Sequence, residues 1–481
     1  MKHQPEGPFF QPPIVSTVGC GRPRFLFIDP ARRTPHVMRG VLDAFVAWCE
    51  RRGCELDGVE LRGSRPTDGF IGGGGGGGTE GGTSCGAGVG AADAVRRGLG
   101  VFAARDIEKG ARVMSVPVDA CVGAGAVRCG AGGAAVPAPF PGATAVECLA
   151  WNLLGVKDEE KWKPYVDALP AGFDTPTSGA WDSKEIAELQ IGDAVAGVAI
   201  TLAKDAKAAR AVAEKEVDPR AWAWALACAR TRATEVRTEN ASGADTGALG
   251  LLLVPFVDMM NHSHEDAHVE FSHEAGPVTG VAADGDDQNT GRLVLTAVRD
   301  IPAGTEITTT YRQGDPLDTV PLRDVYALHM GFIGGHDNED KVDLFKSLRA
   351  AATWYAATFK SEAGEEVVDR GKAQGVADAL TRRLSGEGPP RLGWGATVTG
   401  GLLDLFEYFN AMIMPGKDPS ELASHAVALR CQELLLQFQT TAEEDLALLE
   451  SSQGSARLKL AVEFRLRKKA ILQHMVHGKG E

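Results

Sequence analysis

The hydrophobic pattern of this chain changes type along its length, and that change limits the folds available to it. Two stretches, one near residue 100 and one near residue 300, contain alternating or β-branched segments beside short glycine turns, a pattern typical of strands. From about residue 340 to the end, apolar residues recur at the spacing of a helix. The sequence therefore predicts an α+β fold followed by a separate all-α C-terminal domain, residues 339–481.

The region before the first strands combines one helix with segments that have no pattern. Val41, Phe45 and Cys49 share one helical face, which predicts a helix that ends near Gly53. Residues 1–40 form a poorly defined amino-terminal segment. Residues 64–95 contain an unbroken glycine run and few apolar side chains, so we expect a disordered insertion there. A phosphate-binding loop is disfavoured because no Lys-Ser or Lys-Thr follows the run.

Helices are also expected between the two strand regions, from residue 144 to residue 238. Asp182 and Glu185 have the spacing of a capping box, and Asp218 followed by Pro219 is a typical helix start. The same start signal recurs at Asp418 in the C-terminal region. We therefore predict a helical insertion at residues 144–238 within a larger domain at residues 41–338.

The two strand regions share a short sequence, Ala-Arg-Asp-Ile at residues 104–107 and Val-Arg-Asp-Ile at residues 298–301. In each region, one strand is followed by this sequence, a glycine turn and a second strand. We expect two hairpins, residues 100–116 and residues 293–311. The likeness is either an internal echo or chance.

Charge and cysteine content narrow the classes of function. A net charge of −14 disfavours broad nucleic-acid binding, which depends on Lys and Arg neutralising phosphates. The nine cysteines form no C-x-x-C pair, which is typical of reduced thiols. No stretch has the roughly 20 apolar residues of a membrane helix. We expect a soluble protein of the cytoplasm or nucleus, with a plastid as the alternative because residues 1–40 are rich in Arg.

Four motifs occur in a fixed order and carry the chemistry. They are Arg97-Gly98-Leu99-Gly100-Val101-Phe102, Val254-Pro255-Phe256-Val257-Asp258-Met259-Met260-Asn261-His262-Ser263, Gly304-Thr305-Glu306-Ile307-Thr308-Thr309-Thr310-Tyr311 and Met330-Gly331-Phe332. In content and order they resemble the SET-domain methyltransferases, in the branch typified by the Rubisco large-subunit lysine methyltransferase and its actin-histidine relatives. The segments 439–445 and 457–462 resemble that branch's C-terminal substrate-binding domain. The resemblance implies a SET-type β-fold with a helical insertion.

The resemblance implies a role for each motif residue, with S-adenosyl-L-methionine as the cofactor and no metal. Tyr311 matches the catalytic tyrosine, whose phenol would orient the incoming amine and hold the methyl group by a C–H···O contact. The expected cofactor-binding residues are Gly98, Leu99, Gly100, Arg230, Asp258, Asn261, His262 and Phe332. Arg232, Thr234 and Met330 would line the substrate channel.

Taken without the resemblance, these residues have ordinary structural interpretations. The glycines fit a turn before a strand, Asn261 a helix cap, His262 a buried histidine, and Phe332 a core residue. Arg230 and Arg232 fit a solvated pair. Met330 and Thr234 also depart from the plant enzymes, which carry a tyrosine and an aromatic residue there. The acceptor residue and the number of methyl groups therefore stay open.

Three other functions compete with a protein-lysine N-methyltransferase. One is a protein-histidine methyltransferase on the same scaffold. Another is a metal-dependent hydrolase that uses the cluster of His262, His264, Asp266, His268 and His273, although its spacing differs by one residue from a His-x-His-x-Asp-His site. The third is a non-catalytic binding protein. For the enzyme, we expect a protein substrate with a basic or lysine-containing segment, docked on the C-terminal helices, and neither nucleic acid nor membrane as partner.

Overall fold

The computed structural model describes most of the chain from residue 35 onward. The described residues are 35–63, 99–124, 137–239, 245–263, 267–274, 291–311, 322–333, 340–359, 368–384, 388–451 and 454–477. The glycine-rich segment 64–95 and Gly98 lie outside them, so the expected insertion and the role of Gly98 stay predictions. No helix among these residues has the length and apolar character needed to cross a membrane.

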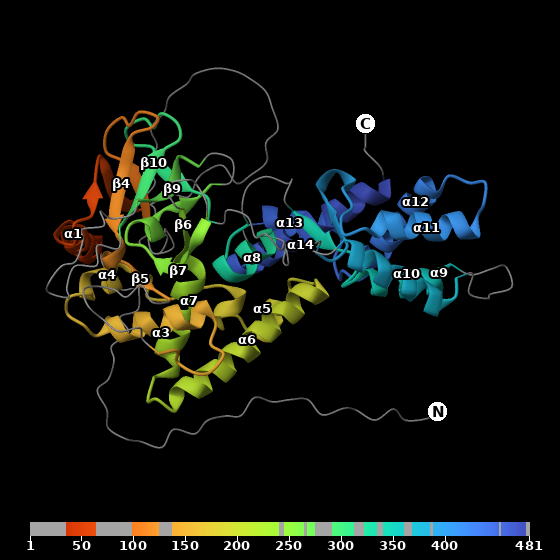
Figure 1. The fold of residues 1–481 in the computed structure, drawn as a ribbon, viewed down its shortest axis with the longest axis horizontal. Helices are drawn as coiled ribbons and strands as arrows, with labels where there is room; N and C mark the ends of the chain where they lie inside the picture. Colours follow the sequence, from red (N-terminus) through yellow and green to blue (C-terminus); the bar gives the residue numbers. More distant parts are fainter. Residues whose placement is uncertain are drawn as a thin grey trace.

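The structure has two large hydrophobic cores, and each core defines one part of the molecule. The first lies in what we call the α/β part, residues 35–333, and is built around side chains such as Phe45, Trp162 and Leu253. The second lies in the C-terminal helical region, residues 340–477, around Phe406 and Phe409. In Figure 1 the strands that are labelled there and the helices α3, α6 and α7 form one group, and α9 to α12 form another.

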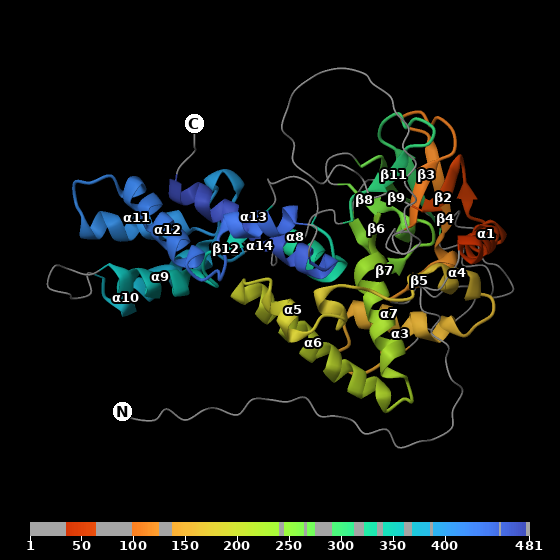
Figure 2. The ribbon, with the colours of Figure 1, turned by 180° about the vertical axis from the view of Figure 1, so that it is seen from behind.

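The α/β part begins with helix α1 (Pro35–Arg51), which agrees with the helix expected at its carboxyl end. Its strands are β1 (Glu55–Leu56), β2 (Val59–Gly63), β3 (Leu99–Ala103), β4 (Arg112–Pro117), β5 (Val122–Gly123), β6 (Ala233–Glu239), β7 (Asp245–Leu253), β8 (Asn261–His262), β9 (Val269–Glu274), β10 (Arg292–Ala297) and β11 (Glu306–Thr309). They form three sheets, with the orders β1-β4-β10-β9, β2-β3-β11-β8 and β5-β7-β6. Figure 2 shows β2, β3, β11 and β8 from behind.

The two expected hairpins are wrong, although their strands exist. β3 pairs with β11, and β4 pairs with β10, so each strand bonds to a strand of the other segment. The two segments that share the Arg-Asp-Ile sequence, 104–107 and 298–301, are the corners that follow β3 and β10, and they form hydrogen bonds with each other. Ile107 and Ile301 exchange backbone hydrogen bonds of 2.9 and 2.8 Å. Asp106 accepts from the amide of Ala303 at 2.7 Å, and Asp300 accepts from that of Lys109 at 2.8 Å. The shared Arg-Asp-Ile sequence thus marks two equivalent corners, where long-range pairing replaces local pairing.

The insertion is helical except at its end. Its helices are α3 (Ala145–Lys157), α4 (Lys163–Ala168), α5 (Ser183–Ala187), α6 (Gly192–Ala213) and α7 (Pro219–Arg232), with the short turn η3 (Pro176–Ser178). The expected capping box of Asp182 and Glu185 is present, and Asp218 caps α7 by accepting from the amide of Arg220. Residues 233–238 are strand β6 and not helix, because alternating β-branched residues there pair with β7.

The C-terminal region contains helices α9 (Leu348–Thr358), α10 (Arg370–Arg383), α11 (Leu402–Ile413), α12 (Pro419–Leu435), α13 (Ala442–Glu450) and α14 (Ala456–His477). Asp418 caps α12, as its sequence predicts. A two-stranded ribbon of β12 (Lys341–Asp343) and β13 (Arg391–Gly393) adds to these helices. The region is otherwise helical, as expected.

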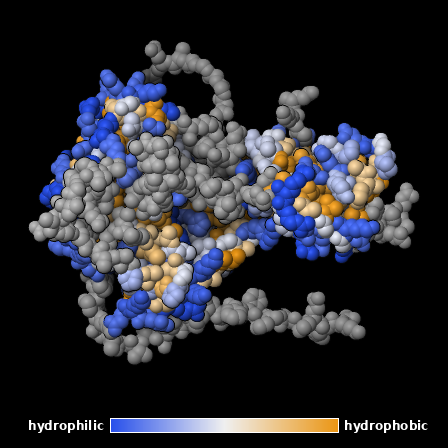
Figure 3. Space-filling model, in the orientation of Figure 1, coloured by the Kyte–Doolittle hydropathy of each residue, from blue (hydrophilic) through white to orange (hydrophobic). Residues whose placement is uncertain are grey.

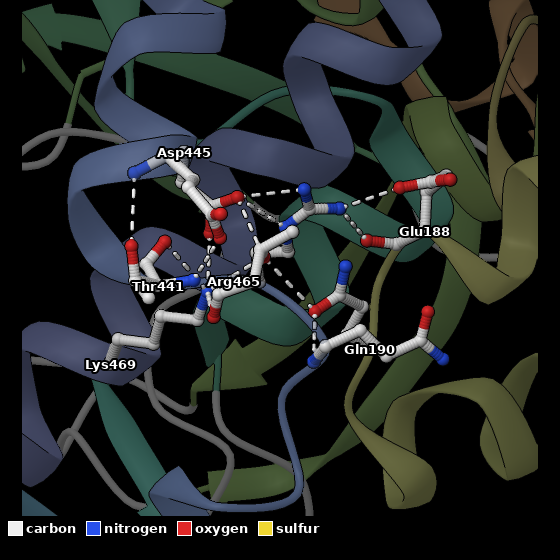
Figure 4. Close-up of polar contacts among 9 residues, drawn as sticks. Glu188, Gln190, Thr441, Asp445, Arg465 and Lys469 are labelled. Carbon is white, nitrogen blue, oxygen red and sulfur yellow. Dashed lines mark hydrogen bonds and ion pairs between the residues drawn. The ribbon is translucent and has the colours of Figure 1, made fainter.

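Helix α14 joins the two parts. Ala461 and Phe464 pack with Trp181 and Val198 of the insertion and with Leu328. Arg465 reaches from α14 to Glu188, donating to its carboxylate at 2.8 Å. Figure 4 shows this contact beside Asp445 and Lys469, which belong to the same polar network. Packing and charge together therefore fix α14 against the insertion.

Candidate functional site

A parallel pairing of two short strands brings the second and third motifs together. Asn261 and His262 form β8, and they pair with Thr308 and Thr309 of β11. Tyr311 lies two residues after the end of β11, and its backbone amide donates to Nδ1 of His262 at 3.2 Å. The motifs are about 50 residues apart in the chain, yet they share one sheet edge.

The first motif reaches the same place through a glycine. Gly100 lies in β3, and a Cβ atom there would approach Oε1 of Glu306 to 2.3 Å. That oxygen accepts from Nδ2 of Asn261 at 2.5 Å. A larger residue at position 100 would therefore displace the carboxylate of Glu306 from its place beside Asn261. Leu99, its neighbour, pairs with Gly63 of β2.

Four aromatic rings meet beside this pair of strands, and we call them the aromatic cluster: His262, Tyr311, Tyr326 and Phe332. The ring of His262 lies 5.2 Å from Tyr311, 4.7 Å from Tyr326 and 6.0 Å from Phe332 between centroids. Tyr326 stacks on Phe332 at 5.3 Å. Such a cluster offers several π-faces to a cation.

The phenol of Tyr311 is held in its neutral form. Burial raises the pKa of Tyr311 to about 12, and the carboxylates of Glu306 and Asp258 act in the same direction, against Arg232. The hydroxyl donates to the carbonyl of Met260 at 2.8 Å. At neutral pH this oxygen therefore keeps its proton and cannot serve as a base.

A buried carboxyl group lies close by. Asp258 is in the short 3-10 turn η4 (Val257–Met259), and the hydroxyl of Tyr165 donates to its Oδ2 at 2.5 Å. Burial raises the pKa of Asp258 to about 6, while Arg232 and Tyr165 oppose this effect. Arg232 donates to the backbone carbonyl of Asp258. Within the described parts of the chain, Oδ1 of Asp258 and Nε of Arg232 are buried without a hydrogen-bond partner.

The backbone before Asp258 is strained. Phe256 is a buried residue with φ 69° and ψ −44°, a conformation that residues other than glycine rarely adopt. Such strain is typical of functional sites, where the surrounding fold enforces it. Here it directs the chain from β7 into the turn that carries Asp258 and then into β8.

The two arginines of α7 face opposite ways, since residues two positions apart on a helix lie about 200° apart around its axis. Arg232 points to the turn at Asp258. Arg230 instead forms a two-pronged ion pair with Asp205 of α6. Together with Leu202, Trp222 and His329 it lines a cavity of about 200 Å³. The structure therefore places Arg230 at this cavity, between the insertion and η5, and its expected cofactor role stays a prediction.

Two further expected residues, Thr234 and Met330, lie on neighbouring elements. Thr234 lies in β6 opposite Leu252. Met330 ends the π-helical turn η5 (Tyr326–Met330), which follows the short helix α8 (Leu322–Val325). His264 and Asp266 of the histidine cluster lie outside the described residues. In the described portion, no three His, Cys, Asp or Glu side chains gather as a metal site.

Three residues at the site were not assigned a role from the sequence. Glu306 belongs to the third motif, and the glycine at position 100, beside its carboxylate, is the sequence signal for it. Tyr326 lies six residues before Phe332, and only the π-turn brings its ring back to that residue. Tyr165 belongs to the insertion and gave no signal at all.

Comparison with known proteins identifies the class. Residues 98–312 match the family model of the SET domain, and residues 408–472 match that of the Rubisco LSMT substrate-binding domain. The chain thus carries a SET domain followed by a Rubisco LSMT substrate-binding domain. These two domains are those of a SET-type protein methyltransferase that uses S-adenosylmethionine as its methyl donor. The SET-type fold expected from the motifs is confirmed.

Within that class the chain is similar to two kinds of enzyme. It is 25% identical over 412 residues to the chloroplastic ribulose-1,5-bisphosphate carboxylase/oxygenase large subunit N-methyltransferase of Nicotiana tabacum, covering 79% of this chain and 76% of that one. It is 23% identical to an actin-histidine N-methyltransferase of Canis lupus familiaris, covering 68% of this chain and 55% of that protein. Its fold matches the SET domain of LSMT bound to lysine and AdoHcy, with a TM-score of 0.57, 16% identity and coverage of 91% and 90%.

Proposed function

We propose that this protein is a protein-lysine N-methyltransferase whose methyl transfer takes place at the aromatic cluster. The observation that carries the proposal is the convergence of Gly100, Asn261, His262 and Tyr311 around the neighbouring strands β3, β11 and β8. The catalytic domain, on this proposal, extends over residues 41–338, and the substrate-binding domain over residues 339–481. The separate hydrophobic cores of the two parts support this division.

The residues present suit a sulfonium cofactor. When bound, S-adenosylmethionine supplies a methyl carbon activated by a positively charged sulfur. Aromatic faces attract such a cation. Asp258 and Arg232 have buried polar atoms with no hydrogen-bond partner in the described structure, and such atoms favour a polar ligand. We assign cofactor contacts to Leu99, Asp258, Asn261, His262 and Phe332, and a supporting role to Gly100 through Glu306.

Tyr311 is proposed as the catalytic residue. Its hydroxyl donates to Met260, so its oxygen faces the site as an acceptor only. An acceptor oxygen can hold a partly positive methyl group by a C–H···O contact and can align the incoming amine. Because the pKa of Tyr311 is about 12, the phenol does this in its neutral form.

The acceptor amine must lose its proton before it can attack. Transfer of a lysine ammonium from water into an apolar, aromatic channel disfavours the charged form and lowers the pKa of that amine. The cluster supplies such surroundings. The reaction therefore needs no side chain as a separate base, because the ammonium loses its proton to water. Arg232, Thr234 and Met330 are proposed to line the channel.

A histidine acceptor is the second candidate. Met330 and Thr234 stand where the plant enzymes have aromatic residues, and these changes would leave more room than a lysine side chain requires. The similarity to actin-histidine methyltransferases supports the same alternative. We favour lysine because the rings of the aromatic cluster offer π-faces to its cationic side chain.

The C-terminal region is proposed to dock the protein substrate. Figure 3 shows hydrophobic surface on these helices. Among the described residues, the exposed large hydrophobic side chains are Ile200, Trp394, Tyr408, Met412, Met414, Leu436, Leu446 and Leu448, so seven of the eight lie beyond residue 390. Exposed apolar surface gathered on one domain is typical of a protein-binding site.

The test uses labelled S-adenosylmethionine. The purified protein is incubated with the labelled cofactor and a cell extract, and the modified residue is located by mass spectrometry. We expect a methylated lysine. Tyr311→Phe, which removes only the hydroxyl, should lower the yield by about 10²-fold, the usual effect of removing one preorganised group. Tyr355→Phe makes the same change in the core of the C-terminal region, where the hydroxyl donates to Asn410, and should leave the yield unaltered.

Each result decides one part of the proposal. A methylated histidine would replace lysine as the acceptor while keeping the class. Equal yields from Tyr311→Phe and the wild type would remove Tyr311 from the catalytic role.

A further inference from the structure

Two buried charged groups and one partly buried charged group meet where α14 contacts the end of the α/β part. The side chains of Lys468 and Asp340 are 3% and 4% exposed, and that of Asp324 is 18% exposed. Nζ of Lys468 lies 2.5 Å from Oδ1 of Asp324 and 2.9 Å from Oδ1 of Asp340, and it donates to the carbonyl of Lys341 at 2.6 Å. Lys468 of the C-terminal region thus binds two carboxylates, and one of them, that of Asp324, belongs to α8.

Helix α8 leads directly into the turn that carries Tyr326. Asp324 lies two residues before Tyr326, the first residue of η5. From the other side, the hydroxyl of Thr177 donates to the carbonyl of Leu328 at 3.0 Å. Gly331, which ends the turn with φ 79°, would bring a Cβ to 3.1 Å from Thr175. The turn is therefore fixed between the insertion and α14.

Stability alone gives no reason for a buried ion pair at this place. Replacing such a pair with well-packed apolar residues is often neutral or stabilising, because burying charges costs desolvation energy. Burial raises the pKa of Asp324 to about 6, although Lys468 opposes this shift, so the cost is evident here. The ion pair is directional, so it fixes the position of α8, which an apolar contact cannot do.

We infer that Tyr326 is a further wall of the acceptor channel and that Lys468, acting through Asp324, is the residue that positions it. The C-terminal domain then helps to set the geometry of methyl transfer, in addition to its proposed docking role. This inference rests on the proposed function. Tyr326 supplies an aromatic ring to the cluster while position 330, the plant tyrosine position, holds methionine.

The neighbouring lysine provides a matched control. Lys469 is as buried as Lys468, at 2% exposure, and binds Asp445 at 2.6 Å and the carbonyl of Thr440 at 2.6 Å (Figure 4). These contacts stay within the C-terminal region and do not touch α8 or η5. Lys468→Met and Lys469→Met therefore remove equivalent buried charges, and only the first affects the turn.

The experiment compares four variants of the full chain: Lys468→Met, Lys469→Met, Asp324→Asn, and the double variant of Lys468→Met with Asp324→Asn. Asp324→Asn is the mildest change, because Lys468 keeps Asp340. Hydrogen–deuterium exchange is followed in residues 324–333. Methyl transfer from labelled S-adenosylmethionine to cell-extract protein is measured in parallel.

We expect faster exchange in residues 324–333 and about tenfold slower methyl transfer for Lys468→Met and Asp324→Asn, since small misplacement of aligned groups has large effects on rate. The double variant should lose no more than the larger single loss, because both changes break one contact. Lys469→Met should leave both measurements within twofold of the wild type.

Equal losses from Lys468→Met and Lys469→Met, additive losses in the double variant, or unchanged exchange in residues 324–333 would overturn the inference. Failure of the proposed function has a different signature. The wild type itself would then transfer no methyl group, while the exchange data would still decide whether Lys468 fixes the turn.

Discussion

Two buried aspartates in this protein have opposite electrostatic environments. Asp445, in the C-terminal region, is fully buried and accepts hydrogen bonds from Arg465, Lys469 and Thr440. Burial alone would raise its pKa, but these bonds outweigh that effect and lower it. Asp258, beside the aromatic cluster, has one hydroxyl partner for its carboxylate, and burial raises its pKa to about 6.

The difference separates a structural network from a binding site. At Asp445 the charges are matched by partners, which is what a buried network needs in order to hold two elements together. At Asp258 one carboxylate oxygen is buried without a partner in the described structure. Such incomplete pairing costs stability, and it persists at sites where a ligand completes the hydrogen bonds.

The largest effect should follow from breaking the matched network. Asp445→Asn would leave Arg465 and Lys469 buried with no full counter-charge, so we expect the free energy of unfolding to fall by about 3–5 kcal/mol. Urea unfolding measures this loss. Asp404→Asn is the control, because Asp404 forms an exposed pair with Arg383 and should cost less than about 1 kcal/mol. Equal losses in the two variants would contradict the comparison.

A smaller effect, opposite in its pH dependence, is expected at Asp258. Its pKa is higher in the folded state than in the unfolded state, so its ionisation destabilises the fold as pH rises from about 4 to about 6. A shift from 3.8 to about 6 corresponds to about 3 kcal/mol at most. Asp258→Asn should therefore gain stability relative to the wild type across this window.

The measurement is urea unfolding of the wild type and Asp258→Asn at several pH values. Other titrating groups cancel in the difference between the two proteins. Asp445 has a lowered pKa, so its contribution should instead be lost on acidification. A difference curve for Asp258→Asn that is flat between pH 4 and pH 6 would show that the two aspartates are alike.

The smallest of the three effects is steric. Gly100→Ala would place a Cβ against Glu306, which must then move and release Asn261. We expect a loss of about 1–3 kcal/mol, the usual cost of overpacking. Gly197→Ala in α6 has no atom within 4 Å of its Cβ and should be stabilising. Thermal unfolding of the two variants measures the difference, and a stabilising Gly100→Ala would refute the proposed contact.

Local signals in the sequence predicted the helices well. Asp182, Asp218 and Asp418 each bond to amides a few residues away, so nearby residues alone determine these helix starts. The motif residues Asn261, His262, Tyr311 and Phe332 do lie together, as the resemblance implied. Their individual roles stay predictions.

Long-range partners could not be predicted in this way. The strands near residues 100 and 300 favoured hairpins by local pattern, but each corner instead bonds to the other corner. Tyr326 reaches the site only through a π-turn, a feature with no sequence signal. Arg230 and Arg232 are close in the sequence, which favours one shared site for both. Helix geometry instead turns Arg230 toward Asp205.

Isothermal titration calorimetry with S-adenosylmethionine tests the central claim most directly, because it asks whether the residues around Asp258 and the aromatic cluster form one cofactor site. We predict saturable heat with one site per chain, weakened by Gly100→Ala and unchanged by Gly197→Ala. The absence of saturable heat with the wild type, or equal binding by Gly100→Ala and the wild type, would contradict the account.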